Sequence, residues 1–253
     1  MKSLFRKVLR RAGYDFVRFT PRSSNLASLQ HCLKFYSIDL VLDVGANTGQ
    51  YAQLLRTLGY TGQVISFEPL SSAHSCLLAA SRQDALWTVA PRVALGHEEG
   101  EITLNISANS QSSSALALLD MHLKVAPESA YVSSEKVNLK RLDAIAPSYL
   151  QGSKDSVFLK IDVQGLEDKV LDGAKNILDT VVGIQLELSM APLYQGEMPY
   201  QDMLAHVKKL GYELYSLSPV ICHPDSGRVL QMDGIFIKNT HSSMSPTSFV
   251  HKP

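Results

Sequence analysis

Three acidic residues of the 253-residue sequence each end a short apolar segment. Their carboxylates could bind a ligand or accept a proton. The three residues are Asp43, Glu68 and Asp162. Short apolar segments of this kind are typical of buried parallel strands. Because open α/β sheets bind ligands at the edge formed by the carboxyl ends of their strands, we expect the three carboxylates to meet in one site there.

A glycine turn, Gly45-Ala-Asn47-Thr48-Gly49, follows the first acid and leads into a helical pattern. Such a turn presents free N–H groups and the positive end of a helix dipole, so we expect its residues to bind a cofactor. A dinucleotide site needs a glycine where Asn47 stands. Asp43 would also repel a pyrophosphate, whereas it would attract the ammonium and sulfonium groups of S-adenosylmethionine (SAM). The pattern therefore favours SAM over NAD, and the lack of a Gly-Lys-Ser/Thr sequence excludes a P-loop.

The second acid, Glu68, lies 19 residues beyond Gly49. An acid at this distance accepts hydrogen bonds from ribose hydroxyls in many nucleotide-binding folds. The feature suits SAM and NAD alike. An NAD-dependent oxidoreductase therefore stays open as an alternative enzyme, and a SAM-fold protein that binds without turnover stays open as an alternative of another class.

The third acid belongs to the segment 158–167, which places charged side chains within an otherwise apolar strand. Buried charges must be paired, and Lys160 and Glu167 could pair with each other or with Glu187. Asp162 ends this strand at the same sheet edge as the other two acids. We therefore expect Asp162 to belong to the ligand site.

Strands and helices alternate around these segments, which is typical of the βαβ units of an open parallel sheet. The pattern predicts one α/β domain over residues 38–240. Helices are predicted over 24–37, 50–58, 71–81, 165–175 and 200–210, and strands over 39–44, 63–68, 86–95, 157–162, 181–188, 213–218 and 231–238.

The middle of the chain interrupts this alternation. Polar and apolar residues alternate over 102–107, which predicts a half-exposed strand, and 137–142 forms another extended piece. Between them, residues 108–114 are polar and cannot bury themselves, although a solvated loop is the simplest explanation of such a run. We expect the region 108–135 to be an insertion or lid over the site.

The balance of charge is uneven along the chain. The 24 Lys+Arg residues equal the 24 Asp+Glu residues, which argues against nucleic-acid binding over the whole surface. Residues 1–22, however, carry seven basic residues and one acid, a charge of +6, which leaves −6 on the remainder. Apolar residues recur at helical spacing here, so residues 1–37 should form a basic, amphipathic helical segment. This segment could contact an acidic membrane surface or a partner, or pack on its own domain.

The cysteines and the C-terminal residues carry no sign of a disulfide framework, a metal site or further folded structure. Cys32, Cys76 and Cys222 are odd in number and widely spaced. They therefore form neither a disulfide framework nor a metal site, and free buried thiols of a cytoplasmic protein are expected. The Ser/Pro-rich residues 241–253 are predicted to be a disordered tail.

Taken together, these segments make residues 38–238 resemble the FkbM family of SAM-dependent methyltransferases. The resemblance implies a class I methyltransferase fold, Rossmann-like and open, whose mostly parallel seven-stranded sheet has helices on both faces and an antiparallel last strand. It also implies O-methylation of hydroxyls, often on sugars or natural products. The matching sequences are VLDVGANTG (41–49), ISFEP (65–69), FLKIDVQGLEDKVLDGA (158–174), IQLELSMAPLYQG (184–196) and MDGIFIK (232–238). The residues that the resemblance assigns to SAM are Asp43, Gly45, Asn47, Gly49, Glu68 and Asp162.

Methylation of a hydroxyl requires that its oxygen be aligned with the methyl group and that a base take its proton. Asp162 and Glu187 are the expected catalytic acids. If Asp162 holds the methionine amino group, His122, His223 and Tyr194 become candidates for the base. Two carboxylates could instead hold Mg²⁺, which prefers oxygen ligands, although the spacing does not support such a site.

The acceptor is expected to be a small molecule or glycan that carries a hydroxyl, such as a sugar, a glycolipid or a natural product, and not a nucleic acid. Hydroxyl and amide side chains are suited to reading its hydroxyls by hydrogen bonds. We expect Asn109, Ser113 and Tyr194 to contact it.

Overall fold

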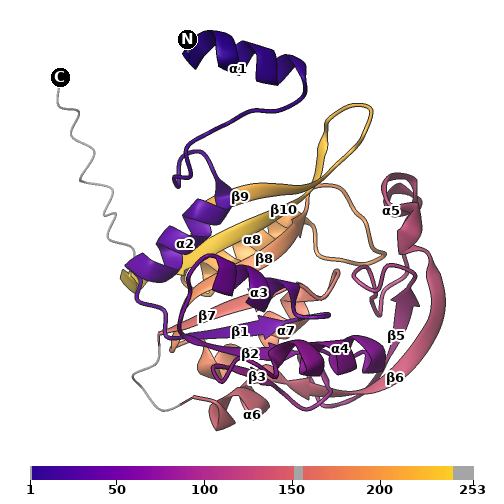
Figure 1. Ribbon diagram of the computed structural model, residues 1–253. Coiled ribbons are helices and arrows are strands. Elements are labelled where there is room, and N and C mark those ends of the chain that lie inside the picture. Colours follow the sequence, from indigo (N-terminus) through magenta and orange to yellow (C-terminus); the bar gives the residue numbers. More distant parts are fainter. Residues whose placement is uncertain (1, 151–155, 242–253) are drawn as a thin grey trace.

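The computed structural model describes residues 2–150 and 156–241, with a seven-stranded sheet at its centre (Figure 1). The strands of this sheet are β1 (Leu40–Val44), β2 (Gln63–Phe67), β3 (Trp87–Val89), β7 (Val157–Ile161), β8 (Val181–Ser189), β9 (Tyr212–Cys222) and β10 (Val229–Lys238). Their order across the sheet is β3-β2-β1-β7-β8-β10-β9. The neighbours from β3 to β8 pair in parallel, whereas β10 pairs antiparallel with both β8 and β9. This topology confirms the mostly parallel sheet with an antiparallel last strand.

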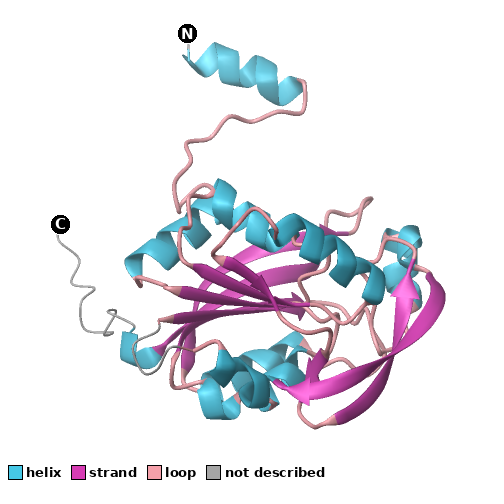
Figure 2. Cartoon of the chain, turned by 60° about the horizontal axis from the view of Figure 1, so that its bottom comes forward, coloured by secondary structure: helices cyan, strands magenta, loops and turns pink. Residues whose placement is uncertain are grey.

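Helices cover both faces of the sheet (Figure 2). The helices of the described residues are α1 (Lys2–Arg11), which lies apart from the sheet, and α2 (Asn25–Phe35), α3 (Gln50–Thr57), α4 (Ser71–Ser81), α5 (Asp120–Val125), α6 (Leu142–Ile145), α7 (Glu167–Asp172) and α8 (Tyr200–Lys209), with short 3₁₀ helices η1 (Pro127–Ser129), η2 (Ala146–Ser148), η3 (Lys175–Ile177) and η4 (Asn239–His241). Successive side chains of a strand point to opposite faces. Val41 accordingly joins the apolar cluster that contains Leu55 of α3, whereas Leu42 joins the cluster that contains Leu171 of α7. The predicted strands therefore form the core between two helical layers.

A second, three-stranded sheet forms the small β insertion. Its strands are β4 (Ala94–Gly96), β5 (Gly100–Ser107) and β6 (Tyr131–Arg141), in the order β4-β6-β5. The half-exposed strand expected at 102–107 is β5, and β6 begins earlier than the extended piece expected at 137–142. The chain between β5 and β6 contains the polar segment 108–114 and α5.

Two expected elements are each divided in the structure. The strand predicted over 86–95 is split into β3 and β4, which belong to different sheets. Pro91 lies between them, and proline cannot donate a hydrogen bond within a continuous strand. The helix predicted over 165–175 is split into α7 and η3 at Gly173. A Cβ atom at Gly173 would lie 1.8 Å from the carbonyl oxygen of Gly96, so the close approach of these two segments requires glycine.

The structure corrects the prediction for two of the three cysteines and does not describe most of the C-terminal tail. Cys32 is buried as expected, but Cys76 and Cys222 are exposed. Among the residues that the structure describes, no helix is long and apolar enough to cross a membrane. Of the predicted C-terminal tail, residues 242–253 lie outside the described residues.

Candidate active site

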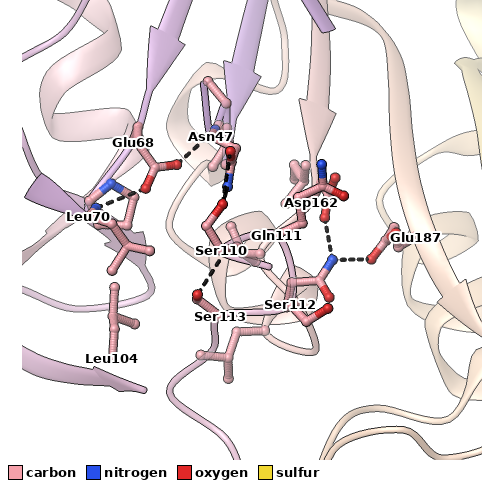
Figure 3. A pocket seen from close by; sticks show the side chains of 18 of the residues that line it. Asn47, Glu68, Leu70, Leu104, Ser110, Gln111, Ser112, Ser113, Asp162 and Glu187 are labelled. Carbon is pink, nitrogen blue, oxygen red and sulfur yellow. Dashed lines mark hydrogen bonds between the residues drawn. The ribbon is translucent and has the colours of Figure 1, made fainter. Parts of the chain in front are cut away.

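A cavity of about 830 Å³ opens at the carboxyl edge of the large sheet. Glu68 after β2 and Asp162 after β7 line it, as does Glu187 within β8. The polar segment 108–114 contributes Asn109, Ser110, Gln111, Ser112 and Ser113 to its wall (Figure 3). The structure thus brings together acids that lie far apart in the sequence, 119 residues in the case of Glu68 and Glu187.

The glycine turn follows β1 as predicted, but its glycines are required mainly by packing. Gly45 lines the cavity with a φ of +77°, and a Cβ there would lie 1.8 Å from the carbonyl oxygen of Asp162. Gly49 has a φ of +95°, and a Cβ there would lie 2.6 Å from the ring of Trp87. Only glycine fits such close approaches at positive φ. Gly49 and Thr48 are not among the described residues that line the cavity, so their placement does not support the direct cofactor contact expected of them.

Glu68 is held in the cavity by the main chain. Its Oε2 accepts the N–H of Asn47 at 2.8 Å, and its Oε1 accepts the N–H of Leu70 at 2.8 Å. Burial raises the pKa of Glu68 to about 7, although these two hydrogen bonds favour the ionised form. Each carboxylate oxygen keeps a lone pair, so the group is suited to accept hydrogen bonds from a ribose.

Asn47 connects the glycine turn to the polar segment. Its φ of +46° places it in the left-handed region, which asparagine tolerates better than most residues. Its Oδ1 accepts the N–H of Thr48 at 2.8 Å, and its Nδ2 donates to Oγ of Ser110 at 3.2 Å (Figure 3). The polar segment therefore lies against the glycine turn.

Asp43 does not face the cavity, which corrects the expectation that it meets the ligand. It is fully buried between its neighbours in the adjacent strands, Ser66 and Lys160. Oγ of Ser66 donates to its Oδ2 at 3.1 Å, and Nζ of Lys160 lies 3.2 Å from its Oδ1. Burial raises the pKa of Asp43, and the ion pair with Lys160 opposes that shift.

Lys160 lies between the acids of β1 and β7. Nζ donates to the carbonyl oxygen of Gly45 at 3.0 Å and lies 3.4 Å from Oδ2 of Asp162. Burial lowers its pKa, but the carboxylates of Asp162 and Asp43 outweigh burial and raise it, so the ammonium stays charged. Of the pairings that the sequence left open, the one between Lys160 and Glu167 is not formed, and Glu167 instead accepts the N–H groups of Val163 and Gly165.

Asp162 and Glu187 are joined by one amide group. Nε2 of Gln164 donates to Oδ1 of Asp162 at 2.6 Å and to Oε2 of Glu187 at 2.8 Å (Figure 3). Nε2 of Gln231 also donates to Oε2 of Glu187, at 3.0 Å. Burial and the neighbouring Asp162 raise the pKa of Glu187 far above its ordinary value, whereas the side chain of Asp162 is 33% exposed. The two acids thus differ in their environments.

Two further residues of this cluster were not predicted as site residues. Asp233 lies opposite Glu187 in the pairing of β10 with β8 and accepts from Nε2 of Gln185 at 3.2 Å. Burial, with Asp162 as a second cause, raises the pKa of Asp233 to about 6. Gln164 has a φ of +59°, an uncommon conformation for a residue other than glycine. A charged residue within the apolar strand 232–238 was the sequence signal for Asp233, but no signal in the sequence set Gln164 apart.

Of the three residues expected to contact the acceptor, two line the cavity and one does not. Tyr194 is buried outside the cavity, where its hydroxyl donates to Oε1 of Gln164 at 2.5 Å. Asn109 and Ser113 do line the cavity, yet Nδ2 of Asn109 and Oγ of Ser113 bond within the polar segment and to its neighbours. Tyr194 therefore contacts a site residue and not the space for a ligand.

The two candidate histidines lie apart. His122 lines the cavity, is almost fully buried, and has no hydrogen-bond partner at either ring nitrogen among the described residues. Burial lowers the pKa of His122, so its ring is neutral. His223 lies beyond β9 and does not line the cavity within the described part of the chain. Of the two, only His122 is near enough to act on a bound molecule.

The site does not fit the suggested magnesium ion. No group of three or more His, Cys, Asp or Glu residues suited to a metal is present in residues 2–150 and 156–241. The two carboxylates considered for it, Asp162 and Glu187, both accept from the amide of Gln164, and an N–H donor directed at them does not suit a cation.

The sheet topology, with a cavity at the carboxyl edge of its strands, is that of the class I methyltransferase fold. The sequence profile of the Methyltransferase FkbM domain matches residues 43–214, which is more than half of the chain. The protein belongs to the FkbM methyltransferase family. A comparison with curated protein sequences finds no match.

Three solved structures illustrate the fold similarity. Fibrillarin from Aeropyrum pernix, determined with bound SAM, is 11% identical over 84% of this chain and 73% of that chain, with a TM-score of 0.47. A SAM-dependent methyltransferase from Mesorhizobium loti is 8% identical over 87% and 100%, with a TM-score of 0.47. An rRNA methylase from Streptococcus thermophilus is 11% identical over 85% and 97%, with a TM-score of 0.45.

Proposed function

We propose that the protein transfers a methyl group from SAM to a hydroxyl of a sugar, a glycolipid or a natural product. The observation that carries the proposal is a single cavity with Glu68 on one side and Asp162 and Glu187 on the other (Figure 3), with Asp233 also in its wall. One cavity therefore contains an acid that can bind a ribose. The same cavity contains acids that can attract cationic groups or accept a proton.

The residues of the chain fit this cofactor by their chemistry. Glu68 would hold the ribose, and the cavity-facing acids would favour the ammonium and sulfonium groups. Gly45 and Asn47, which also line the cavity, would form part of the wall around the same ligand. When bound, SAM supplies an electrophilic methyl group on its sulfonium.

The proposed base is Asp162. Its carboxylate is partly exposed in the cavity, and the ammonium of Lys160 and the amide of Gln164 fix its position. It would accept the proton of the acceptor hydroxyl, whereas Glu187, whose Oε2 accepts from the amides of Gln164 and Gln231, would help to position the acceptor. Correct alignment of the hydroxyl oxygen supplies the rest of the rate.

The polar segment 108–114 is proposed to cover the bound acceptor. Asn109 and Ser113 form part of the cavity wall while their side chains stabilise the loop, so they would shape the acceptor site as well as contact it. The acceptor's hydroxyls would then meet the remaining polar atoms of this wall.

The test combines binding with product analysis. Thermal stability is measured with SAM, S-adenosylhomocysteine and NAD, because a bound ligand raises the midpoint of unfolding. Products from a panel of sugars, glycolipids and polyhydroxylated natural products are then analysed by mass spectrometry for an added methyl group. Stabilisation by SAM and methylation at oxygen are expected. Stabilisation by NAD alone, or methylation only of amines, would overturn the proposal.

A further inference from the structure

The N-terminal arm, defined as residues 2–22, lies outside the catalytic body. Figures 1 and 2 show α1 held away from the sheet and its covering helices by an extended stretch of chain. We propose that this arm docks on an anionic lipid bilayer. The proposal concerns attachment and not catalysis, so it stands or falls independently of the methyl acceptor.

The arm is folded on itself. Nη2 of Arg6 donates to the carbonyl oxygen of Phe16 at 3.2 Å, and Nη2 of Arg10 lies 2.8 Å from Oδ2 of Asp15. The N–H of Tyr14 also bonds to the carbonyl oxygen of Leu9 at 2.9 Å. These bonds bring the chain after α1 back toward the helix. The arm is therefore a small unit with its own contacts.

Apolar side chains gather on this unit without cover from the body. Tyr14 and Phe16 are each 67% exposed, and Val17 and Phe19 are 53% and 55% exposed. Four large apolar side chains exposed within six residues favour a surface that removes them from water. An interfacial segment gains by placing such side chains at the boundary of head groups and acyl chains.

The basic side chains add the matching charge. Lys7, Arg11, Arg18 and Arg22 are exposed, and none forms an ion pair in the described part of the chain. The arm carries +6 while the rest of the chain carries −6. An anionic surface therefore attracts the arm and repels the body, which orients the molecule with its arm toward the lipid.

A lipid bilayer fits the two features together better than a nucleic acid does. Phosphates would satisfy the basic residues, but a duplex offers no apolar layer for Phe16, Val17 and Phe19. A bilayer with anionic head groups offers both the charge and the apolar layer. The combination of the two, and not charge alone, is what the arm provides.

The experiment measures co-sedimentation of the full-length protein with vesicles. Vesicles of phosphatidylcholine alone are compared with vesicles containing phosphatidylglycerol, at low and high salt. Binding is expected only to the anionic vesicles and should fall with salt. The variant Lys7→Gln/Arg11→Gln/Arg18→Gln/Arg22→Gln should bind at least about a hundredfold more weakly, since each basic residue near the surface contributes to attraction. Phe16→Ser/Phe19→Ser should bind about tenfold more weakly at unchanged charge.

The matched control removes the same charge from the body. The variant Lys34→Gln/Lys136→Gln/Lys208→Gln/Lys209→Gln changes four exposed lysines and should bind as the wild type does. Equal loss in both quadruple variants, binding to neutral vesicles as strong as to anionic ones, or no binding by the wild type would each overturn the proposal. So would displacement from the vesicles by a single-stranded oligonucleotide at a lower concentration than the lipid. Circular dichroism of each variant confirms that the body stays folded.

Discussion

The two ends of the cavity hold their acids by different means. At the proposed cofactor end, the N–H groups of Asn47 and Leu70 fix the carboxylate of Glu68. At the other end, side-chain amides hold the acids, as Gln164 does for Asp162 and Glu187. Main-chain donors are present whatever the side chain, whereas an amide can be lost by one substitution. The proposed cofactor end is thus fixed by main-chain groups, and the proposed acceptor end by replaceable side chains.

Gly45 lines the cavity against the main chain of Asp162, and its substitution should have the largest effect on the protein. In Gly45→Ala, the new Cβ would clash with the carbonyl oxygen of Asp162, 1.8 Å away. We expect the free energy of unfolding to fall by about 3 kcal/mol. Denaturant unfolding monitored by circular dichroism measures the change.

Gly59→Ala is the matched control for that substitution. Gly59 has a similar φ of +81°, but nothing lies within 4 Å of a Cβ there. Only backbone strain is added, so we expect a loss of about 1 kcal/mol. Equal losses in the two variants would show that the contact between the turn and β7 is not tight.

Replacing the proposed base should separate binding from turnover. In Asp162→Asn, the rate of methyl transfer should fall by about 10² to 10⁴, the usual contribution of general base catalysis. Calorimetry should show SAM binding changed far less than turnover. Asp225→Asn, at an exposed residue, serves as the control. If Asp162→Asn retains turnover, His122→Gln should abolish it, because His122 is the other candidate base that lines the cavity.

Glu68→Gln should weaken SAM binding about tenfold to a hundredfold, since a charge-assisted acceptor is lost. It should also change the effect of pH on stability. The pKa of Glu68 is raised by burial from 4.5 to about 7, so the folded state keeps a proton that the unfolded chain has released between these values. Stability should therefore fall as the pH rises through this window, by roughly 3 kcal/mol, and the variant should lose this part of the slope.

The control for Glu68→Gln is Glu101→Gln, an exposed glutamate. Thermal unfolding between pH 4.5 and pH 8 provides the comparison. If stability depended on pH in the same way in both variants, the proposal that folded Glu68 keeps its proton in this pH range would be wrong.

Gln164→Leu removes the amide that joins the two acids at the acceptor end. We expect turnover to fall about tenfold, because Asp162 and Glu187 lose their common donor. The pH profile of turnover should shift as well, since a merely structural loss would leave its position unchanged. Gln195→Leu, at an exposed glutamine, is the control. An unchanged profile would assign Gln164 to packing alone.

The smallest effect is expected at the contact between the polar segment and the cofactor turn. Ser110→Ala removes the hydrogen bond with Asn47, which contributes about 1 kcal/mol. We expect SAM to bind about threefold to fivefold more weakly in calorimetry, whereas Ser81→Ala on α4 should have no effect. Unchanged binding in Ser110→Ala would mean that the segment does not support the cofactor end.

The sequence predicted the sheet well because apolar strands and glycine turns have local signatures. It failed where a predicted helix is divided by a contact between distant segments, as at Gly173 against Gly96. For the site, the positions of Glu68 and Asp162 at strand ends were sufficient to place them in one cavity. The burial of Asp43 could not be predicted, because it depends on Ser66 and Lys160, which become its neighbours only when the strands pair.

The ion pair of Asp43 and Lys160 has a consequence for the folding of the sheet. The pair exists only because β1 and β7 are aligned with these two residues side by side. A shift of one strand by one residue would turn its charge to the opposite face of the sheet, into an apolar layer and away from the other charge. Misaligned sheets would therefore be far less stable than the native one. The ion pair of Asp43 and Lys160 therefore favours the native register of β1 and β7, the strands that end at the cavity.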